Sequence, residues 1–295
     1  MIATGIVTLG EGNTPLLPAL RLSERFGVEL WLKWEGANPT GSFKDRGMTV
    51  AVSRAVSAGA HTIVCASTGN TAASAAAYAA RAGLEAVIVV VEGAAAGSKL
   101  AQVRAAGGRI VEVQGTFTDA FEHAEKLCEE DGVVHVNSTN PDRIEGQKSA
   151  AFEIVEQLSG LPDVLTLPYG GGGNTKAYAR GFQEAAGALP RIHPAEAERR
   201  ADTFASAIRI VDPVHRAEVE DAIERSGGSI VTVSEDELLQ AWRSVLREEG
   251  LFCEPASAAG VAALARGAAR PGERVVCVLT GHGLKDPVAV ERLVA

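Results

Sequence analysis

The chain has 295 residues, 46% of them hydrophobic, and a formal net charge of −9 at pH 7. This length suggests two domains, and the apolar content allows a sizeable core. The negative charge and the absence of a basic run argue against nucleic acid or an anionic membrane surface as a partner. No apolar stretch approaches the ~18 residues of a membrane span, so we expect no membrane association.

The cysteines and histidines point to a reducing compartment and to no metal site. None of the four cysteines forms a C-x-x-C pair, and Cys65 and Cys277 lie in apolar, strand-like runs where we expect buried thiols. The N-terminus lacks the charged and apolar blocks of a signal peptide, so we expect a cytoplasmic protein. The six histidines include no H-E-x-x-H or other ligand spacing.

Strands and helices are predicted to alternate along the chain. Buried strands are predicted at 62–65, 86–91, 109–113, 133–136, 164–167, 229–233 and 274–279. Helices are predicted after residue 44 and at 71–82, 98–106, 117–129, 144–158, 174–186, 218–225, 235–249 and 255–266. This alternation predicts an α/β fold with parallel-type sheets, helical crossovers and ligands at the carboxyl ends of the strands. The charged, proline-bearing stretch 189–202 is interpreted as a solvated connection.

One lysine, Lys44, stands between the turn Asn38–Ser42 and a run with helical periodicity. A lysine at such a junction has a fixed backbone and a mobile amine, which suits Schiff-base formation with a carbonyl. Taken singly, the same pattern also fits a solvated surface lysine.

A first polar loop, Ser67–Thr71, follows a predicted strand and opens a predicted helix. Its hydroxyls, amide and backbone N–H groups form a natural receptor for a carboxylate or a phosphate. The alternative is a plain helix N-cap, for which Ser, Thr and Asn are also favoured.

Two further loops complete the set. The glycines of Gly170–Asn174 favour a tight turn or a phosphate cradle over a flexible linker, because a strand and a helix flank them closely. The loop matches neither a Walker sequence nor G-x-G-x-x-G. Thr280 directly follows the last predicted strand, where its hydroxyl could meet a ring nitrogen or simply stand in a turn. A lysine, a phosphate cradle and a ring-nitrogen partner are the parts that pyridoxal 5′-phosphate requires.

Seven motifs resemble the threonine synthase family, which belongs to the pyridoxal-phosphate enzymes of fold type II. They are Glu11–Leu16, Asn38–Arg46, Cys65–Ala80, Val136–Ser138, Arg143–Lys148, Glu254–Ala259 and Leu279–Asp286. The cofactor motifs are shared with cysteine synthases and with serine and threonine dehydratases, whereas STGNT, EPASAA and TGHGLKD are more similar to threonine synthases. The resemblance implies a larger cofactor-binding domain at 1–44 and 140–295, a smaller domain at 45–139, and a cofactor in the cleft between them.

The resemblance also implies roles for individual residues. Lys44 would form the Schiff base and act as the catalytic base, with Phe43 packed beside it. The cofactor's ring hydroxyl would be bound by Asn70 and its ring nitrogen by Thr280. The remaining cofactor contacts, to its phosphate, would come from Gly170, Gly171, Gly172, Gly173 and Asn174. Ser67 and Thr68 would hold the substrate carboxylate, and the substrate phosphate would be held by Thr71, Asn137, Ser138 and Arg143.

Two departures from the family pattern bear on the site. Gly171 stands where many threonine synthases have asparagine, which affects one phosphate contact. The region Arg191–Asp202 is shorter and more charged than the corresponding strand of the family.

The implied reaction converts O-phospho-L-homoserine and water into L-threonine and phosphate, in a homodimer. A serine or threonine dehydratase on the same fold is the first alternative, and it needs no second anion site, so Arg143 discriminates between the two. A cofactor-binding protein without turnover is the second. Nicotinamide-dependent redox chemistry is disfavoured because the chain lacks a dinucleotide fingerprint.

Overall fold

The computed structural model describes residues 6–94 and 100–294, and the chain divides into two compact units. The first unit comprises Met1–Glu11, Asn38–Thr40 and Lys44–Gln147. The second comprises Gly12–Ala37, Gly41–Phe43 and Lys148–Ala295. Among the described residues, no helix is both long and apolar enough to cross a membrane.

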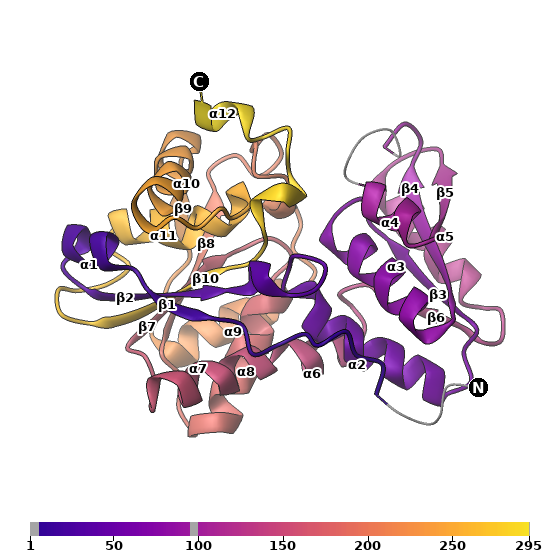
Figure 1. The fold of residues 1–295 in the computed structure, drawn as a ribbon, viewed down its shortest axis with the longest axis horizontal. Helices are drawn as coiled ribbons and strands as arrows, with labels where there is room; N and C mark the ends of the chain where they lie inside the picture. Colours follow the sequence, from indigo (N-terminus) through magenta and orange to yellow (C-terminus); the bar gives the residue numbers. More distant parts are fainter. Residues whose placement is uncertain (1–5, 95–99, 295) are drawn as a thin grey trace. The chain divides into compact units, whose positions relative to one another are not determined.

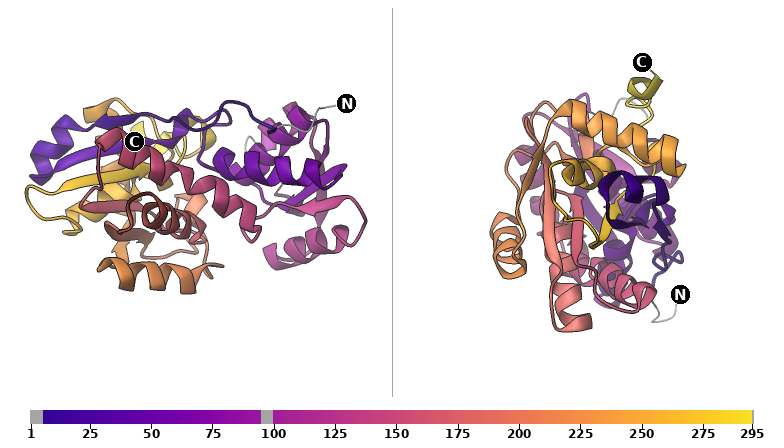
Figure 2. Two further views of the ribbon diagram at one scale, coloured as in Figure 1. Left: turned by 90° about the horizontal axis from the view of Figure 1, so that it is seen from below. Right: turned by 90° about the vertical axis from the view of Figure 1, so that its left-hand side faces the viewer.

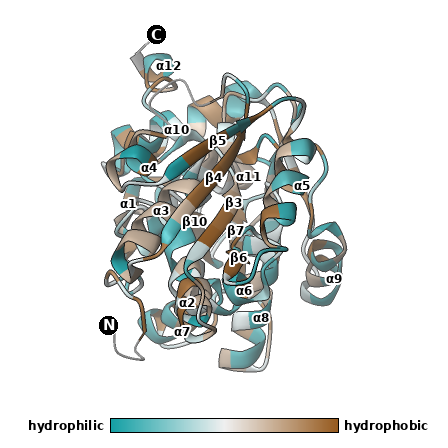
Figure 3. Ribbon diagram, turned by 90° about the vertical axis from the view of Figure 1, so that its right-hand side faces the viewer, coloured by the Kyte–Doolittle hydropathy of each residue, from teal (hydrophilic) through white to brown (hydrophobic). Residues whose placement is uncertain are grey.

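The first unit is built on a parallel sheet with strand order β5-β4-β3-β6. Its strands are β3 (Thr62–Ala66), β4 (Glu85–Val91), β5 (Arg109–Val113) and β6 (Val133–His135). Its helices are α2 (Lys44–Ser57), α3 (Asn70–Ala82), α4 (Ala101–Ala105), α5 (Phe117–Leu127) and α6 (Pro141–Gln147). Residues of α2, α3 and α4 share one apolar core with this sheet and residues of α5 share another. The central strands β3 and β4 are therefore covered on both faces, in keeping with their mostly apolar colouring in Figure 3.

The second unit is built on a larger sheet with strand order β1-β2-β10-β7-β8-β9, parallel except for the β1–β2 pair. Its strands are β1 (Leu16–Pro18), β2 (Glu29–Trp34), β7 (Val164–Pro168), β8 (Arg191–Ala197), β9 (Val231–Val233) and β10 (Arg274–Leu279). Its α-helices are α1 (Leu20–Phe26), α7 (Ser149–Leu158), α8 (Gly173–Ala186), α9 (Arg216–Ser226), α10 (Glu235–Glu249), α11 (Ala259–Ala265) and α12 (Glu291–Val294). Short 3₁₀ turns lie at η1 (Glu35–Ala37), η3 (Ser206–Ile208), η4 (Pro255–Ala258) and η5 (Gly283–Lys285).

Helices cover both faces of this larger sheet (Figure 1, Figure 2). One core combines α1, α10 and α11 with the sheet, and a second core combines α7, α8 and α9 with it. The apolar runs of β7 and β10 are buried along nearly their whole length, as expected for central parallel strands. The predicted α/β fold with two mainly parallel sheets and helical crossovers is confirmed.

Two predictions about individual elements are wrong. The stretch interpreted as a solvated connection contains β8, which lies between β7 and β9 and is mostly buried. The single helix predicted at 144–158 is two helices, α6 and α7, because α6 packs on α2 in the first unit whereas α7 packs on α8 in the second. The helix predicted at 98–106 lies partly outside the described residues, which here begin at 100.

Candidate active site

The residues singled out from the sequence are divided between the two units. The first unit carries Lys44, the loop Ser67–Thr71 and the segment Asn137–Arg143. The second unit carries Gly170–Asn174 and Thr280. All of these groups except Lys44, which begins α2, lie beyond the carboxyl end of a strand, which is where ligands bind in parallel sheets.

Lys44 is the first residue of α2 and is half-buried. The next residue, Asp45, is fully buried and its carboxylate accepts hydrogen bonds from the backbone N–H of Thr40 at 2.7 Å and from the hydroxyls of Thr40 and Ser74 at 2.6 Å. These bonds fix the turn before Lys44 and join the start of α2 to α3. The backbone that carries the Lys44 amine is therefore held rigidly.

The residue before Lys44 is bonded to the end of β10. The N–H of Phe43 donates to the carbonyl oxygen of Thr280 at 3.0 Å, and Ser42 forms an antiparallel bridge with Gly281. Within the second unit, the segment Gly41–Phe43 is thus hydrogen-bonded to the loop that contains Thr280.

The loop Ser67–Thr71 leaves the end of β3 and leads into α3. Its entry is clamped by Asn137, whose Oδ1 accepts the Ala66 N–H at 2.8 Å and whose Nδ2 donates to the Ala66 carbonyl at 2.9 Å. Within the loop, the Ser67 hydroxyl accepts the N–H of Gly69 at 3.1 Å. Every side chain of the loop stays half-buried and accessible to a ligand.

Arg143 is completely buried in α6. Its Nη1 donates to the Val136 carbonyl at 2.8 Å, whereas Nε and Nη2 have no hydrogen-bond partner in the described part of the chain. Burial lowers the pKa of Arg143 to about 10, opposed by Cys65 and Asp45, so the guanidinium remains charged at neutral pH. Two unpartnered donors on a buried cation are costly unless a ligand accepts from them. Ser138, half-buried, lies between Asn137 and this helix.

Close backbone packing explains how α6 brings the arginine inside. A Cβ on Gly47 would lie 2.7 Å from Arg143 Nε, and a Cβ on Gly146 would lie 1.8 Å from the carbonyl oxygen of Arg46. Only glycine fits at both positions, so α2 and α6 approach each other backbone to backbone. Gly146 therefore has a packing role.

The glycine loop leads from the end of β7 into α8. Gly172 has φ +88°, and a Cβ there would lie 2.8 Å from Val219 Cγ2. The N–H groups of Gly170, Gly171 and Gly172 have no acceptor among the described residues. In the first turn of α8, Asn174 Nδ2 and Thr175 Oγ1 are buried and have no hydrogen-bond partner within residues 6–94 and 100–294. Thr175 was not singled out from the sequence as a site residue.

Thr280 is buried beyond β10 in a cluster of polar groups. Its Oγ1 lies 2.9 Å from Ser257 Oγ and 3.5 Å from Glu254 Oε1. The Ser257 hydroxyl also accepts the N–H of Gly281 at 3.0 Å. The sequence motif that contains Glu254 and Ser257 had been noted, but no role had been assigned to either residue.

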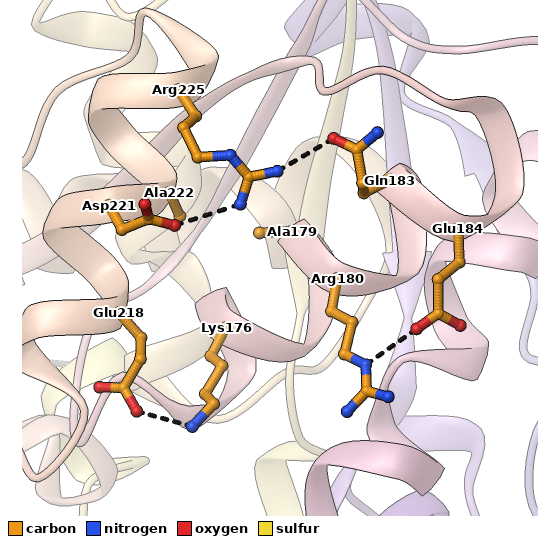
Figure 4. Close-up of a pocket in the computed structure, with 9 residues that line it drawn as sticks. All are labelled: Lys176, Ala179, Arg180, Gln183, Glu184, Glu218, Asp221, Ala222 and Arg225. Atoms are coloured by element: carbon orange, nitrogen blue, oxygen red, sulfur yellow. Dashed lines mark hydrogen bonds and ion pairs between the residues drawn. The ribbon is translucent and has the colours of Figure 1, made fainter.

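A pocket in the second unit lies between α8 and α9 (Figure 4). Its ion pairs are Lys176–Glu218 at 2.6 Å, Arg180–Glu184 at 2.8 Å and Arg225–Asp221 at 3.1 Å. The pocket is lined by Lys176, Ala179, Arg180, Gln183, Glu184, Glu218, Asp221, Ala222 and Arg225. Because each basic group there already has an acidic partner, the pocket is not a candidate anion site.

Comparison with known proteins identifies the family to which the chain belongs. The family model described as "Pyridoxal-phosphate dependent enzyme" matches residues 7–281. A threonine synthase of Bacillus sp. is 49% identical over 95% of this chain and 85% of its own. The chain belongs to the threonine synthase family of pyridoxal-phosphate dependent enzymes. A threonine synthase of Methanocaldococcus jannaschii is 43% identical over 97% of this chain and 78% of its own.

Solved structures agree on the fold. A maize serine racemase has a TM-score of 0.83 at 21% identity and covers 96% of this chain and 92% of its own, which shows the fold alone. A threonine deaminase from Solanum lycopersicum has a TM-score of 0.82 at 26% identity, covering 95% of this chain and 82% of its own.

The residues of the second unit fit the cofactor of this family, pyridoxal 5′-phosphate. The three glycine N–H groups, which have no acceptor in the described part of the chain, together with Asn174 Nδ2 and Thr175 Oγ1, would supply donors for a phosphate at the start of α8. The positive end of the helix dipole favours an anion at the same place.

Proposed function

We propose that this protein converts O-phospho-L-homoserine and water into L-threonine and phosphate. Besides the family, one observation supports this substrate: Arg143 is a buried cation, and two of its donor nitrogens have no partner among the residues that the structure describes. It lies in the same unit as Lys44 and apart in sequence from the glycine loop, so it is available for a second anion. A substrate with both a carboxylate and a phosphate requires such a second receptor.

Each residue then has a defined task. Arg143 binds the substrate phosphate, helped by Thr71 and by Ser138. Ser67 and Thr68, at the start of α3, bind the substrate carboxylate. Asn137, bonded to Ala66 through both ends of its side-chain amide, keeps this loop in position.

Lys44 would hold the cofactor covalently between turnovers, and its Nζ would move protons on and off the substrate carbons. When bound, pyridoxal phosphate supplies the electron sink for charge that develops beside the substrate's amino group. Asn70 binds the ring hydroxyl and Thr280 binds the ring nitrogen. The hydroxyl of Thr280 is neutral, which keeps that nitrogen a weaker electron sink than a carboxylate partner would.

The proposal is tested by incubating the purified holoenzyme with O-phospho-L-homoserine and measuring phosphate and threonine in parallel. Equal amounts of both products are expected. Conversion of threonine to 2-oxobutanoate, without turnover of O-phospho-L-homoserine, would instead identify a dehydratase. Formation of a Schiff base without turnover of either compound would identify a binding protein.

We also propose that the protein works as a cytoplasmic homodimer. The scattered, mostly buried free cysteines support a reducing compartment. The dimer rests on the resemblance to the family, and sedimentation of the purified holoenzyme tests it.

A further inference from the structure

Arg200 lies just beyond β8, in the charged stretch that departs from the family pattern, and its side chain is mostly buried. Its guanidinium pairs with Glu196, with Nε donating to Oε2 at 2.9 Å. Its Nη1 donates to two backbone carbonyls, Ile210 at 2.9 Å and Gly170 at 3.3 Å. Its Cζ lies 4.3 Å from the centre of the Tyr169 ring.

These contacts meet at the entrance of the glycine loop. Tyr169 and Gly170 form the connection from β7 into the loop, and Ile210 covers it, with its Cδ1 3.4 Å from a Cβ position on Gly170. The carboxylate of Glu196 is itself held in place, because its Oε1 accepts a hydrogen bond from the hydroxyl of Thr232 at 3.2 Å. Arg200 therefore joins β8, the segment that covers the loop and the loop itself.

The bonds to the loop carbonyls determine where its N–H groups point. In a planar trans peptide, C=O and N–H point in opposite directions. Arg200 holds the carbonyl of Gly170, whose peptide carries the N–H of Gly171, and the N–H of His215 holds the carbonyl of Gly171 at 3.0 Å. Both N–H groups on the far sides of these peptides have no acceptor among the described residues. A cation on the carbonyl also polarises the peptide and strengthens its N–H as a donor.

We propose that Arg200 is a positioning residue for the cofactor phosphate, which aims and polarises the Gly170–Gly171 peptide without touching the phosphate. This inference rests on the proposed role of the glycine loop. It also gives a use to the charged stretch 198–200, where the chain has Glu-Arg-Arg. Arginine suits the task because its planar fork serves a carboxylate and two carbonyls at once, whereas lysine offers a single point charge.

The experiment compares the wild type with Arg200→Ala and Arg200→Lys, after removal of the cofactor with hydroxylamine. Pyridoxal 5′-phosphate and pyridoxal, which lacks the phosphate, are titrated into each protein, and binding is read from the Schiff-base absorbance. Losing hydrogen bonds from a charged group should raise the Kd of Arg200→Ala for pyridoxal 5′-phosphate by about ten- to a hundredfold. Arg200→Lys should lose less, and the Kd for pyridoxal should change much less in both variants.

Arg199→Ala is the matched control, because Arg199 is the exposed neighbour of the same residue type and should leave both affinities unchanged. Guanidinium chloride, well below denaturing concentrations, should restore part of the phosphate-dependent affinity of Arg200→Ala but have no such effect on the wild type. If Arg200→Ala kept the wild-type preference for pyridoxal 5′-phosphate over pyridoxal, the positioning role would be wrong. If its affinity for both compounds fell equally without rescue, Arg200 would be a general structural residue. A wild type without any preference would instead contradict the phosphate role of the loop.

Discussion

The side chain of Asn137 hydrogen-bonds both the N–H and the carbonyl of Ala66, at 2.8 and 2.9 Å. Asn137 follows β6, and Ala66 is the last residue of β3. The side-chain amide of Asn137 therefore extends the hydrogen bonding between these two parallel strands beyond the end of β6. The resemblance to the threonine synthase family implies that Asn137 contacts the substrate phosphate. The structure adds a second task, because the clamp lies immediately before the loop Ser67–Thr71.

Replacing Asn137 by alanine should leave the buried N–H and carbonyl of Ala66 unpaired. Each lost bond of this kind costs roughly 1–3 kcal/mol, so the urea midpoint should fall at constant m-value. The KM for O-phospho-L-homoserine should rise as well, because the loop is no longer held. Unchanged stability together with a raised KM would mean that Asn137 acts on the substrate and not on Ala66.

Gly172→Ala should weaken cofactor binding. The positive φ costs ~1–2 kcal/mol for an L-residue, and the new Cβ would also press on Val219. Gly187→Ala is the matched control, because Gly187 has φ +68° at the other end of α8 but open space around a Cβ. Both variants should lose stability, and only Gly172→Ala should show a raised Kd for pyridoxal 5′-phosphate. Equal Kd values in the two variants would mean that the loop only connects β7 to α8.

Lys44→Ala should abolish the Schiff base and lower turnover by about 10²–10⁴-fold or more, since the same amine also acts as the catalytic base. Borohydride reduction of the wild-type holoenzyme, followed by peptide mapping, should find the cofactor on Lys44. A label on another lysine would overturn the assignment of the cofactor lysine.

Much of the fold is visible in the sequence because local patterns and tertiary structure agree. The apolar runs that form β4 and β10 are buried on both faces, and such runs have few other uses in a soluble domain. The polar loops could also be predicted, because Ser67–Thr71 and Gly170–Asn174 each lie between a recognisable strand and the recognisable helix that follows it.

The strand β8 was missed because its sequence does not look buried. His193, Pro194 and Glu196 interrupt its apolar pattern, yet all but Arg191 and Glu196 are buried. Proline is tolerated because β8 pairs with β9 only from Ala195 onward, so the missing N–H falls before that ladder. The contacts of Arg200 to Gly170 and Ile210 depend on this strand, and no spacing in the sequence indicates them.

The groups around Thr280 were missed for a different reason. Glu254 and Ser257 precede Thr280 by more than 20 residues and reach it only through the packing of η4 against β10. The sequence predicts a helix at 255–266, and polar side chains at the start of a helix need no ligand to explain them.

Glu218 provides a test of electrostatics outside the site. Its hydrogen bond from Lys176 lowers the pKa of Glu218 from 4.5 to about 2. A carboxyl group whose pKa is lower in the folded than in the unfolded state stabilises the fold at pH values above its unfolded pKa. For Glu218 this stabilisation is lost as the pH falls from 4.5 to about 2. Because the pair is partly exposed and screened, Glu218→Gln should cost less than about 1 kcal/mol at pH 7. The difference from the wild type, measured by urea unfolding, should vanish toward pH 2. A difference that grew on acidification would contradict this sign.

The central claim is that Arg143 receives the phosphate of O-phospho-L-homoserine. Arg143→Ala should lower kcat/KM for this substrate by about ten- to a hundredfold or more, as expected for the loss of hydrogen bonds to a charged group. The affinity for serine, measured from the change in the Schiff-base spectrum, should change little, because serine places no anion at that position. The most direct measurement therefore compares two changes between Arg143→Ala and the wild type: the change in kcat/KM for O-phospho-L-homoserine and the change in the affinity for serine. A large loss for O-phospho-L-homoserine with serine binding preserved is the predicted result. Equal losses for both would make Arg143 a structural residue and would contradict the account.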